Sequence, residues 1–252
     1  MAFTRRALLA ALSVCPICAG VARAAESGSP HWSYEGHGGP ARWGSLEQGF
    51  AACSVGNQQS PVDLDGAVTA AGAGPALAWK PDAFRVTNNG HTIQADVAGD
   101  AGAATIGGKT YMLRQFHFHA PSEHAVAGKR SAMEAHFVHA DADGSLLVLG
   151  VFLVPGQVNP AFAKIMAAAP KAAGAQALDG ALDPAGLLPQ ARSVYRYEGS
   201  LTTPPCSEVV DWNVLAAPVE VAQADIDAFR AIFPMNARPI QAMNRRFLLR
   251  LN

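Results

Sequence analysis

The sequence has little charge, and neither sign predominates. Charged residues make up 15% of the 252 residues, and 19 basic side chains stand against 20 acidic ones. A protein that binds nucleic acid normally carries a basic patch that neutralises phosphates. The balance therefore argues against a nucleic-acid partner.

Long hydrophobic runs are also lacking, except at the start of the chain. Arg5-Arg6 precede an apolar stretch from Ala7 to Val14, and small residues follow up to Ala22-Arg23-Ala24. The stretch is well short of the roughly 20 residues that span a bilayer, and its pattern is typical of a cleaved export signal. We predict a signal peptide over residues 1–24 that directs export of the protein by the general or the twin-arginine route. The mature protein, residues 25–252, would be periplasmic or secreted, without membrane contact.

Cysteine is scarce as well. Cys15 and Cys18 lie within the predicted leader, which leaves the mature chain only Cys53 and Cys206. In an oxidising compartment two cysteines most simply form one disulfide, and two buried free thiols are the alternative. Zinc ligation by these two cysteines is disfavoured, because nothing near them supplies metal-ligand spacing.

The mature chain shows no internal repeat and no linker between domains, so we expect one domain with one core. An Ala/Gly-rich stretch over residues 67–78 is typical of a surface loop. The runs with strand character are residues 84–97, 105–119, 132–140 and 145–154. Asp141-Ala142-Asp143-Gly144 between the last two favours a hairpin.

Helical pattern is rare. Asn159 is a candidate cap for a short helix that begins at Pro160. Ile226, Phe229 and Ile232 recur at helical spacing before Pro234 ends the element. The sequence thus predicts a mainly β domain with a few short helices.

Three histidines stand out against this background. His117 and His119 flank Phe118, and His136 follows in a second predicted strand. Successive side chains of a strand point to opposite faces, so His117 and His119 share a face. If the two strands are neighbours, three imidazoles converge, which is the donor set of a catalytic zinc site with an open fourth position.

Two polar residues near the histidines suit an outer shell. Gln115 lies two residues from His117 and Glu134 two residues from His136, each on the histidine's face. A zinc-bound imidazole donates its second N–H to such a group, which fixes the orientation of the ring. Exposure on the polar face of an edge strand is the alternative for either residue taken alone.

The chain resembles the α-class carbonic anhydrases of the exported bacterial kind from about His31 to Arg246. The motifs that carry the resemblance are Gln58-Gln59-Ser60-Pro61-Val62, Asn88-Asn89-Gly90-His91, Gln115 to His119, Ser122-Glu123-His124, Glu134 to His139, and Ser200-Leu201-Thr202-Thr203-Pro204-Pro205. It implies a single domain on a central, twisted, mostly antiparallel sheet. It also implies a disulfide between Cys53 and Cys206.

The resemblance implies that His117, His119 and His136 hold Zn²⁺ and that a zinc-bound hydroxide hydrates CO2 reversibly to bicarbonate and a proton. Thr202 would accept a hydrogen bond from the hydroxide and donate its own to an ionised Glu123. His91 would shuttle the released proton to solvent, a role that suits a side chain titrating near neutrality.

Further roles follow from the same resemblance. Asn236 would join Gln115 and Glu134 in the outer shell, and Thr203 would orient bicarbonate. An apolar wall for CO2 would consist of Val138, Val148, Leu201 and Trp212, and the shuttle waters would be ordered by Tyr34, Asn89 and Gln94. Inhibition by anions and sulfonamides is expected, and relatives of this kind allow a homodimer.

Three other functions compete with this interpretation. His117-x-His119-x-x-x-Glu123 is also cupin-like ligand spacing, which would make Glu123 a metal ligand, but no histidine follows His139. A catalytically inactive binding module of the same family would lack one or more of the three histidines. A zinc-storage protein would carry histidine-rich tracts.

Overall fold

The computed structural model describes residues 32–252. The signal peptide predicted over residues 1–24 and the predicted start of the mature chain lie outside the described residues. Among residues 32–252, no helix is both long and apolar enough to cross a bilayer.

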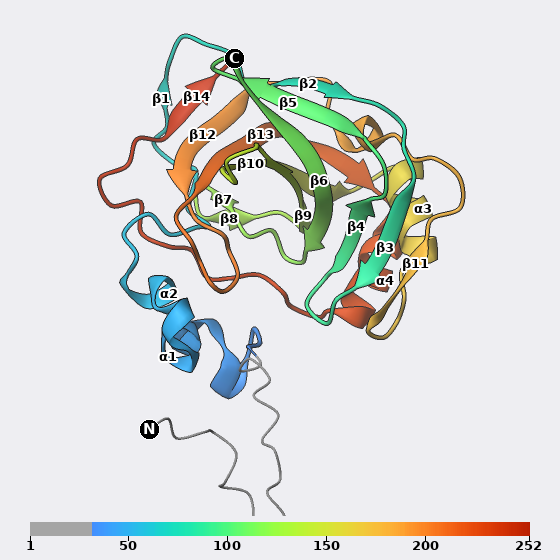
Figure 1. The fold of residues 1–252 in the computed structure, drawn as a ribbon, viewed down its shortest axis with the longest axis horizontal. Helices are drawn as coiled ribbons and strands as arrows, with labels where there is room; N and C mark the ends of the chain where they lie inside the picture. The colour runs from blue at the N-terminus through green and yellow to red at the C-terminus, as the bar shows by residue number, and fades with distance from the viewer. Residues whose placement is uncertain (1–31) are drawn as a thin grey trace, which may run out of the picture.

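One large twisted sheet carries the fold (Figure 1), with twelve strands in the described part of the chain. In their order across the sheet, ten of them are β1 (Val68–Thr69), β14 (Leu249–Leu251), β12 (Val194–Gly199), β13 (Val210–Val221), β10 (Leu146–Pro155), β9 (Met133–Ala140), β6 (Lys109–His119), β4 (Ile93–Val97), β3 (Phe84–Asn88) and β11 (Gly174–Ala177). β5 (Gly102–Ile106) pairs with the first half of β6, and β2 (Ala76–Trp79) pairs with β5. Only the pairs β10–β13 and β1–β14 are parallel among the described strands. The prediction of a mainly β, mostly antiparallel sheet is confirmed.

The smaller elements are short. They are α1 (Trp43–Leu46), α2 (Ala52–Val55), α3 (Pro160–Ala168), α4 (Gln223–Ile232), the hairpin of β7 (Ala125–Val126) and β8 (Lys129–Arg130), and 3-10 turns at Gly36–Gly38, Pro40–Arg42, Gln48–Phe50 and Pro184–Leu187. Both predicted helices are confirmed. Asn159 caps α3 because its Oδ1 accepts from the N–H groups of Ala161 and Phe162, and α4 ends before Pro234.

Two of the predicted strands are in fact hairpins or parts of hairpins. The run 84–97 is split into β3 and β4 by a turn in which Gly90 has a φ of +87°. The run 105–119 is split into the end of β5 and all of β6 at Gly107-Gly108, where φ is +57° and +77°. Only glycine adopts such angles without strain, so each pair reverses the chain. The runs 132–140 and 145–154 agree with β9 and β10, which form the predicted hairpin.

The prediction of a surface loop over residues 67–78 is wrong in part. It contains β1 and most of β2, which pair with β14 and β5. The strands β11, β12, β13 and β14 were not predicted as strands from the sequence.

The two faces of the sheet carry different side chains. Phe116, Phe118 and Phe137 point into the larger hydrophobic core, which α3 and α4 cover through Phe162 and Phe229. Figure 1 shows both helices next to β3, β4 and β11. Each of the three histidines is the sequence neighbour of one of these phenylalanines, so the alternation of the strands places the histidines on the opposite face.

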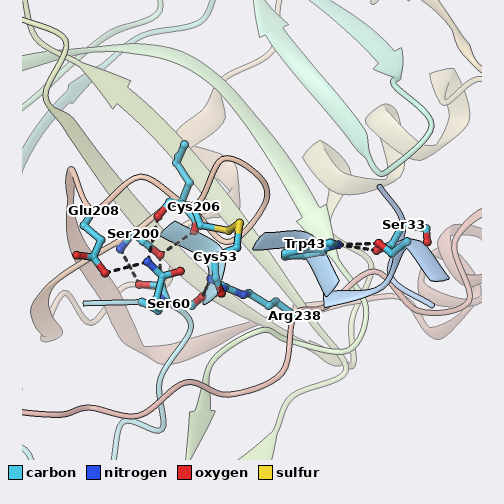
Figure 2. The surroundings of a disulfide bond; sticks show 11 residues. Ser33, Trp43, Cys53, Ser60, Ser200, Cys206, Glu208 and Arg238 are labelled. Atoms are coloured by element: carbon cyan, nitrogen blue, oxygen red, sulfur yellow. Dashed lines mark hydrogen bonds between the residues drawn. A yellow bond between two sulfur atoms is a disulfide. The ribbon is translucent and has the colours of Figure 1, made fainter. Parts of the chain in front are cut away.

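The N-terminal helices are fastened to the loop after β12. Cys53 in α2 forms a disulfide with Cys206, as predicted (Figure 2). Both cysteines pack with the fully buried Trp43. The Trp43 indole donates to the carbonyls of Ser33 and Gly38, and its ring lies 5.5 Å from the guanidinium carbon of Arg238. The segment before the sheet is thus tied to two later segments of the chain.

His139 is a buried histidine on the core side of β9. Trp79 donates its indole N–H to His139 Nε2 at 3.1 Å, and His139 Nδ1 lies 3.2 Å from the carbonyl oxygen of Leu147. The indole can donate only to an unprotonated nitrogen, so this ring is neutral. Burial lowers the pKa of His139 to about 4.

Protonation of His139 should therefore weaken the fold in acid. The unfolded chain takes up this proton near pH 6.5 and the folded chain only near pH 4, so the stabilisation is complete above pH 6.5 and is lost as pH falls to about 4. The variant His139→Gln lacks this titrating group, so its unfolding free energy should fall less than that of wild type as pH drops from 7 to 4. For the metal-free proteins, the difference between variant and wild type should change by roughly 3 kcal/mol in favour of the variant over that range. Urea denaturation at several pH values measures this, with His37→Gln as an exposed control. A difference independent of pH would contradict it.

Candidate metal centre

The three predicted ligands converge. His117 and His119 lie on β6, and His136 is the register partner of His117 on the adjacent strand β9. One ring nitrogen from each of the three lies within 4.8 Å of the other two. His119 and His136 are each 1% exposed. The structure therefore brings together the set that the alternation in the sequence suggested.

The second nitrogen of each ring faces an oxygen. His117 Nδ1 lies 2.9 Å from Gln115 Oε1, and His119 Nδ1 lies 2.7 Å from the carbonyl oxygen of Asn236. His136 Nε2 lies 3.0 Å from Glu134 Oε1. These contacts orient the rings. They leave three nitrogens available to bind one metal ion, namely Nε2 of His117, Nε2 of His119 and Nδ1 of His136. Asn236 serves through its main-chain oxygen, while its side chain binds Ala120 N–H and the carbonyls of His91 and Phe118.

The chemistry of this donor set fits a zinc ion. His119 Nε2 and Glu123 Oε2 are buried without a hydrogen-bond partner among residues 32–252. Buried polar atoms without a hydrogen-bond partner are rare in folded proteins, and a bound ion or water commonly accounts for them. Burial, then the proximity of the other two rings, lowers the pKa of His117 well below its ordinary value, and burial also lowers the pKa of His119. Neutral imidazoles are the form that binds a metal.

Glu134 is a fully buried acceptor behind His136. Its Oε2 accepts from the backbone N–H groups of Glu123 and His124, each at 2.9 Å, and its Oε1 lies 2.7 Å from His124 Nδ1. Burial alone would raise the pKa of Glu134, but the two histidines and their hydrogen bonds outweigh it and hold the pKa well below its ordinary value. Gly150 makes room for this carboxylate, since a Cβ there would lie 2.9 Å from Glu134 Oε1. Gly150 was not singled out from the sequence.

The cupin-like alternative assigns Glu123 to the metal. In the structure Glu123 Oε1 accepts from the backbone N–H of Arg238 at 2.8 Å, and Oε2 lies 3.5 Å from His119 Nε2. Glu123 therefore lies beside the ligands with one oxygen already held. Thr202 is 6% exposed, and its predicted hydrogen bond to Glu123 stays a prediction. Arg238, which positions Glu123, was missed because no local pattern links residues 115 apart.

The predicted apolar wall lies next to the histidines on the same face. Val138, Val148 and Trp212 are register partners across β9, β10 and β13, one step along the face from His136. They belong to one hydrophobic cluster together with Leu201. The Trp212 ring lies 4.8 Å from the His136 ring. Thr203 follows in the loop, where its carbonyl accepts from Cys206 N–H.

The predicted shuttle His91 lies in the β3–β4 turn. Its ring stacks on Trp32, with 3.7 Å between centroids and 9° between planes. Asn89 Oδ1 accepts from the N–H groups of His91 and Thr92, so the Asn89 side chain shapes the turn. Trp32 was not singled out from the sequence, since a stack between segments 59 positions apart leaves no local signal.

The other two residues of the predicted water network lie on different segments, and both are half-buried. Gln94 is the register partner of His117, and its amide donates to Asp96 Oδ1. Tyr34 packs edge-on against Trp32 and Trp43. Burial, and then the charge of Glu123, raises the pKa of Tyr34 well above its ordinary value. Their ordering of waters stays a prediction.

Comparisons with known proteins agree on one family. A family model described as eukaryotic-type carbonic anhydrase matches residues 38–250. A carbonic anhydrase of Neisseria gonorrhoeae is 41% identical over 235 residues, which cover 92% of this chain and 92% of the relative.

Solved structures give the same result. The α-carbonic anhydrase of Thermovibrio ammonificans, in complex with sulfanilamide, is 44% identical with a TM-score of 0.85, covering 88% of this chain and 100% of that one. A carbonic anhydrase of Chlamydomonas reinhardtii, in complex with acetazolamide, is 36% identical with a TM-score of 0.76, covering 87% of this chain and 99% of that one.

Proposed function

The chain belongs to the eukaryotic-type, or α-class, carbonic anhydrase family and is a lyase of that family, and from this premise we propose that it hydrates CO2 reversibly to bicarbonate and a proton with zinc at its three histidines. The observation that carries the proposal is the convergence of three imidazole nitrogens whose opposite nitrogens each lie 2.7–3.0 Å from an oxygen. Zn²⁺ bound there would supply a hydroxide at neutral pH, because it lowers the pKa of bound water to about 7, a value for which carbonic anhydrase is itself the standard example.

Glu123 and Thr202 would orient the attacking group. Glu123 Oε2 is buried, lies beside the ligands and has no hydrogen-bond partner in the described part of the chain. A carboxylate oxygen in that place can accept a hydrogen bond from the hydroxyl of Thr202. Thr202 Oγ1 would then act only as an acceptor toward the nucleophile, which turns a lone pair toward the substrate.

The apolar wall would hold the substrate. CO2 carries no charge and donates no hydrogen bond, so burial against apolar side chains favours it over water. Val148 and Trp212 are each 2% exposed beside His136, and Val138 and Leu201 complete the surface. Thr203, next to Thr202, would bind the bicarbonate product.

His91 would carry the released proton to solvent. It lies in an exposed turn that Asn236 connects to the metal centre, because Asn236 Nδ2 donates to the His91 carbonyl and Asn236 O faces His119. The stack on Trp32 would hold the ring at one edge of the site, with waters ordered by Tyr34, Asn89 and Gln94 between them.

We expect His91→Ala to lower maximal turnover by one to two orders of magnitude, at or below the low end of the range for a positioned acid–base group. The value of kcat/KM should change little, since the shuttle acts after hydration. Small imidazole buffers should restore turnover. His37→Ala, a change at an exposed histidine away from the metal centre, is the control. Turnover that does not depend on His91 would remove the shuttle assignment but leave the zinc assignment standing.

The function itself is tested by stopped-flow CO2 hydration on the zinc-loaded mature protein. A rate above that of the buffer, which sulfonamides and inorganic anions inhibit, is expected; relatives are known in complex with sulfanilamide and acetazolamide. No rate above the buffer with one zinc bound per chain would refute the enzyme proposal. The spectrum of cobalt-substituted protein should show tetrahedral three-nitrogen coordination, which excludes the cupin-like set with Glu123 as ligand.

We also propose export to the periplasm. The leader pattern over residues 1–24 and the disulfide between Cys53 and Cys206 support an oxidising compartment. Fractionation of cells and N-terminal sequencing would show cleavage after Ala24 if this holds. A homodimer remains a prediction that light scattering can test.

A further inference from the structure

Ser60 is a fully buried serine that touches three separate parts of the site. Its N–H donates to Ser200 Oγ at 2.9 Å, and its Oγ accepts from Ser200 N–H at 3.1 Å and from Tyr197 O–H at 3.0 Å. Its carbonyl accepts from Arg238 Nη1 at 2.8 Å. Figure 2 shows Ser60 beside Ser200, with Arg238 on the side of Cys53. One residue thus uses all its polar atoms on distant segments.

The first connection leads to the metal ligand His136. The hydroxyl oxygen of Tyr197 lies 2.6 Å from His124 Nε2, and His124 Nδ1 lies 2.7 Å from Glu134 Oε1. The same carboxylate oxygen lies 3.0 Å from His136 Nε2. Ser60, Tyr197, His124 and Glu134 therefore form an unbroken buried chain of polar contacts that ends at a ligand.

The second connection leads to the loop that carries Thr202. Ser200 Oγ donates to the carbonyl of Leu201 at 2.8 Å, and Trp212 donates its indole N–H to the carbonyl of Ser200 at 3.0 Å. The approach of this loop to Ser60 is close, since a Cβ at Gly199 would lie 2.3 Å from Ser60 Oγ. Glycine at that position is therefore what allows the double hydrogen bond between the two serines.

The third connection leads to Glu123. Arg238 is 1% exposed, and its guanidinium donates to the carbonyls of Ser60 and Cys53. The backbone N–H of the same residue donates to Glu123 Oε1 at 2.8 Å. A shift of Ser60 would therefore move both the chain behind His136 and the group that holds Glu123.

We propose that Ser60 is a positioning residue that holds His136, the Thr202 loop and Glu123 in fixed relation to one another, an inference that rests on the proposed function of this site. The physical basis is cooperativity: buried polar groups that share donors and acceptors hold one another's geometry, and each is costly to leave unpaired. Ser60 touches neither metal nor substrate, so its effect is exerted through the residues that do.

The test compares Ser60→Ala and Tyr197→Phe with Tyr195→Phe, the same change on the same strand and face two residues away, where the ring packs beneath Arg250. The main measurement is the rate at which a chelator removes zinc, which needs no activity. We expect removal to be about three- to tenfold faster for Ser60→Ala and for Tyr197→Phe, below the range for a group in direct contact with a ligand. Tyr195→Phe should match wild type.

Two further readouts separate positioning from simple stability. The double variant should release zinc no faster than Ser60→Ala alone, because both changes break one chain. The pH midpoint of kcat/KM should shift in Ser60→Ala.

Loss of stability in urea with an unchanged zinc-release rate and pH midpoint would overturn the proposal. If Ser60→Ala does not fold, Tyr197→Phe decides between the same two outcomes. Inactive wild type that binds zinc would instead refute the proposed function and leave the zinc-release comparison intact.

Discussion

Replacing His119 by alanine is expected to abolish stoichiometric zinc binding and to reduce CO2 hydration to the rate of the buffer. His119 supplies one of three converging nitrogens, and its residue is 1% exposed with Nε2 lacking a hydrogen-bond partner within residues 32–252. Two imidazoles bind zinc far more weakly than three, and the truncation also leaves the Asn236 carbonyl without its ring N–H. Both effects act against the metal.

Metal analysis after dialysis and stopped-flow hydration measure the two parts of this prediction. His37→Ala removes an exposed histidine outside the converging group and should retain one zinc per chain and full activity. His119→Ala that keeps a stoichiometric zinc and wild-type turnover would show that the catalytic metal, if any, lies elsewhere. Unfolding curves of the metal-free proteins control for a general loss of structure.

The double variant Cys53→Ala/Cys206→Ala is expected to lose roughly 2–5 kcal/mol of unfolding free energy. The disulfide joins residues 153 positions apart, so it restricts the unfolded chain over more than half of its length. In the chain-entropy model, a loop of this size lies at the upper end of the range. Cys53 and Cys206 are buried with Trp43, so alanine leaves no polar group unpaired there.

Urea denaturation of the zinc-loaded double variant and wild type measures the loss. The slope of free energy against urea should rise in the variant, because its unfolded state is more expanded and exposes more surface. Turnover should also fall at temperatures well below unfolding, since Cys206 closes the loop that begins at Ser200 and carries Thr202. Equal unfolding free energies would mean that strain or residual structure cancels the entropic gain.

Local sequence signals predicted those elements whose boundaries are marked by local chemistry. The β9–β10 hairpin follows from Asp141 to Gly144, and α3 from Asn159 before Pro160. The break at Asn89-Gly90 was overlooked because strand-like sequence, in which apolar and polar residues alternate, continues on both sides, so two strands looked like one. The paired glycines 107–108 were overlooked for the same reason.

The strand β13 shows why other parts could not be predicted. Pro218 lies within it, and proline is normally excluded from a central strand because it cannot donate to a neighbour. The structure resolves this conflict: pairing with β12 ends at Leu215, and the register with β10 shifts between Val151 and Leu153. Pro218 therefore lies at a locally free edge, which only the strand order reveals.

The sequence by itself determined the part of the donor set and outer shell that lies on one strand. Alternation along a strand places His117 and His119 on one face and sets Gln115 two residues away, because both relations depend only on the geometry of a single strand. What only the tertiary structure decided is which segments meet there: the pairing of β6 with β9, the stack of Trp32 on His91, and the convergence on Ser60. Those contacts join residues tens to more than a hundred positions apart, and such pairings depend on the packing of the whole sheet, which no local pattern encodes.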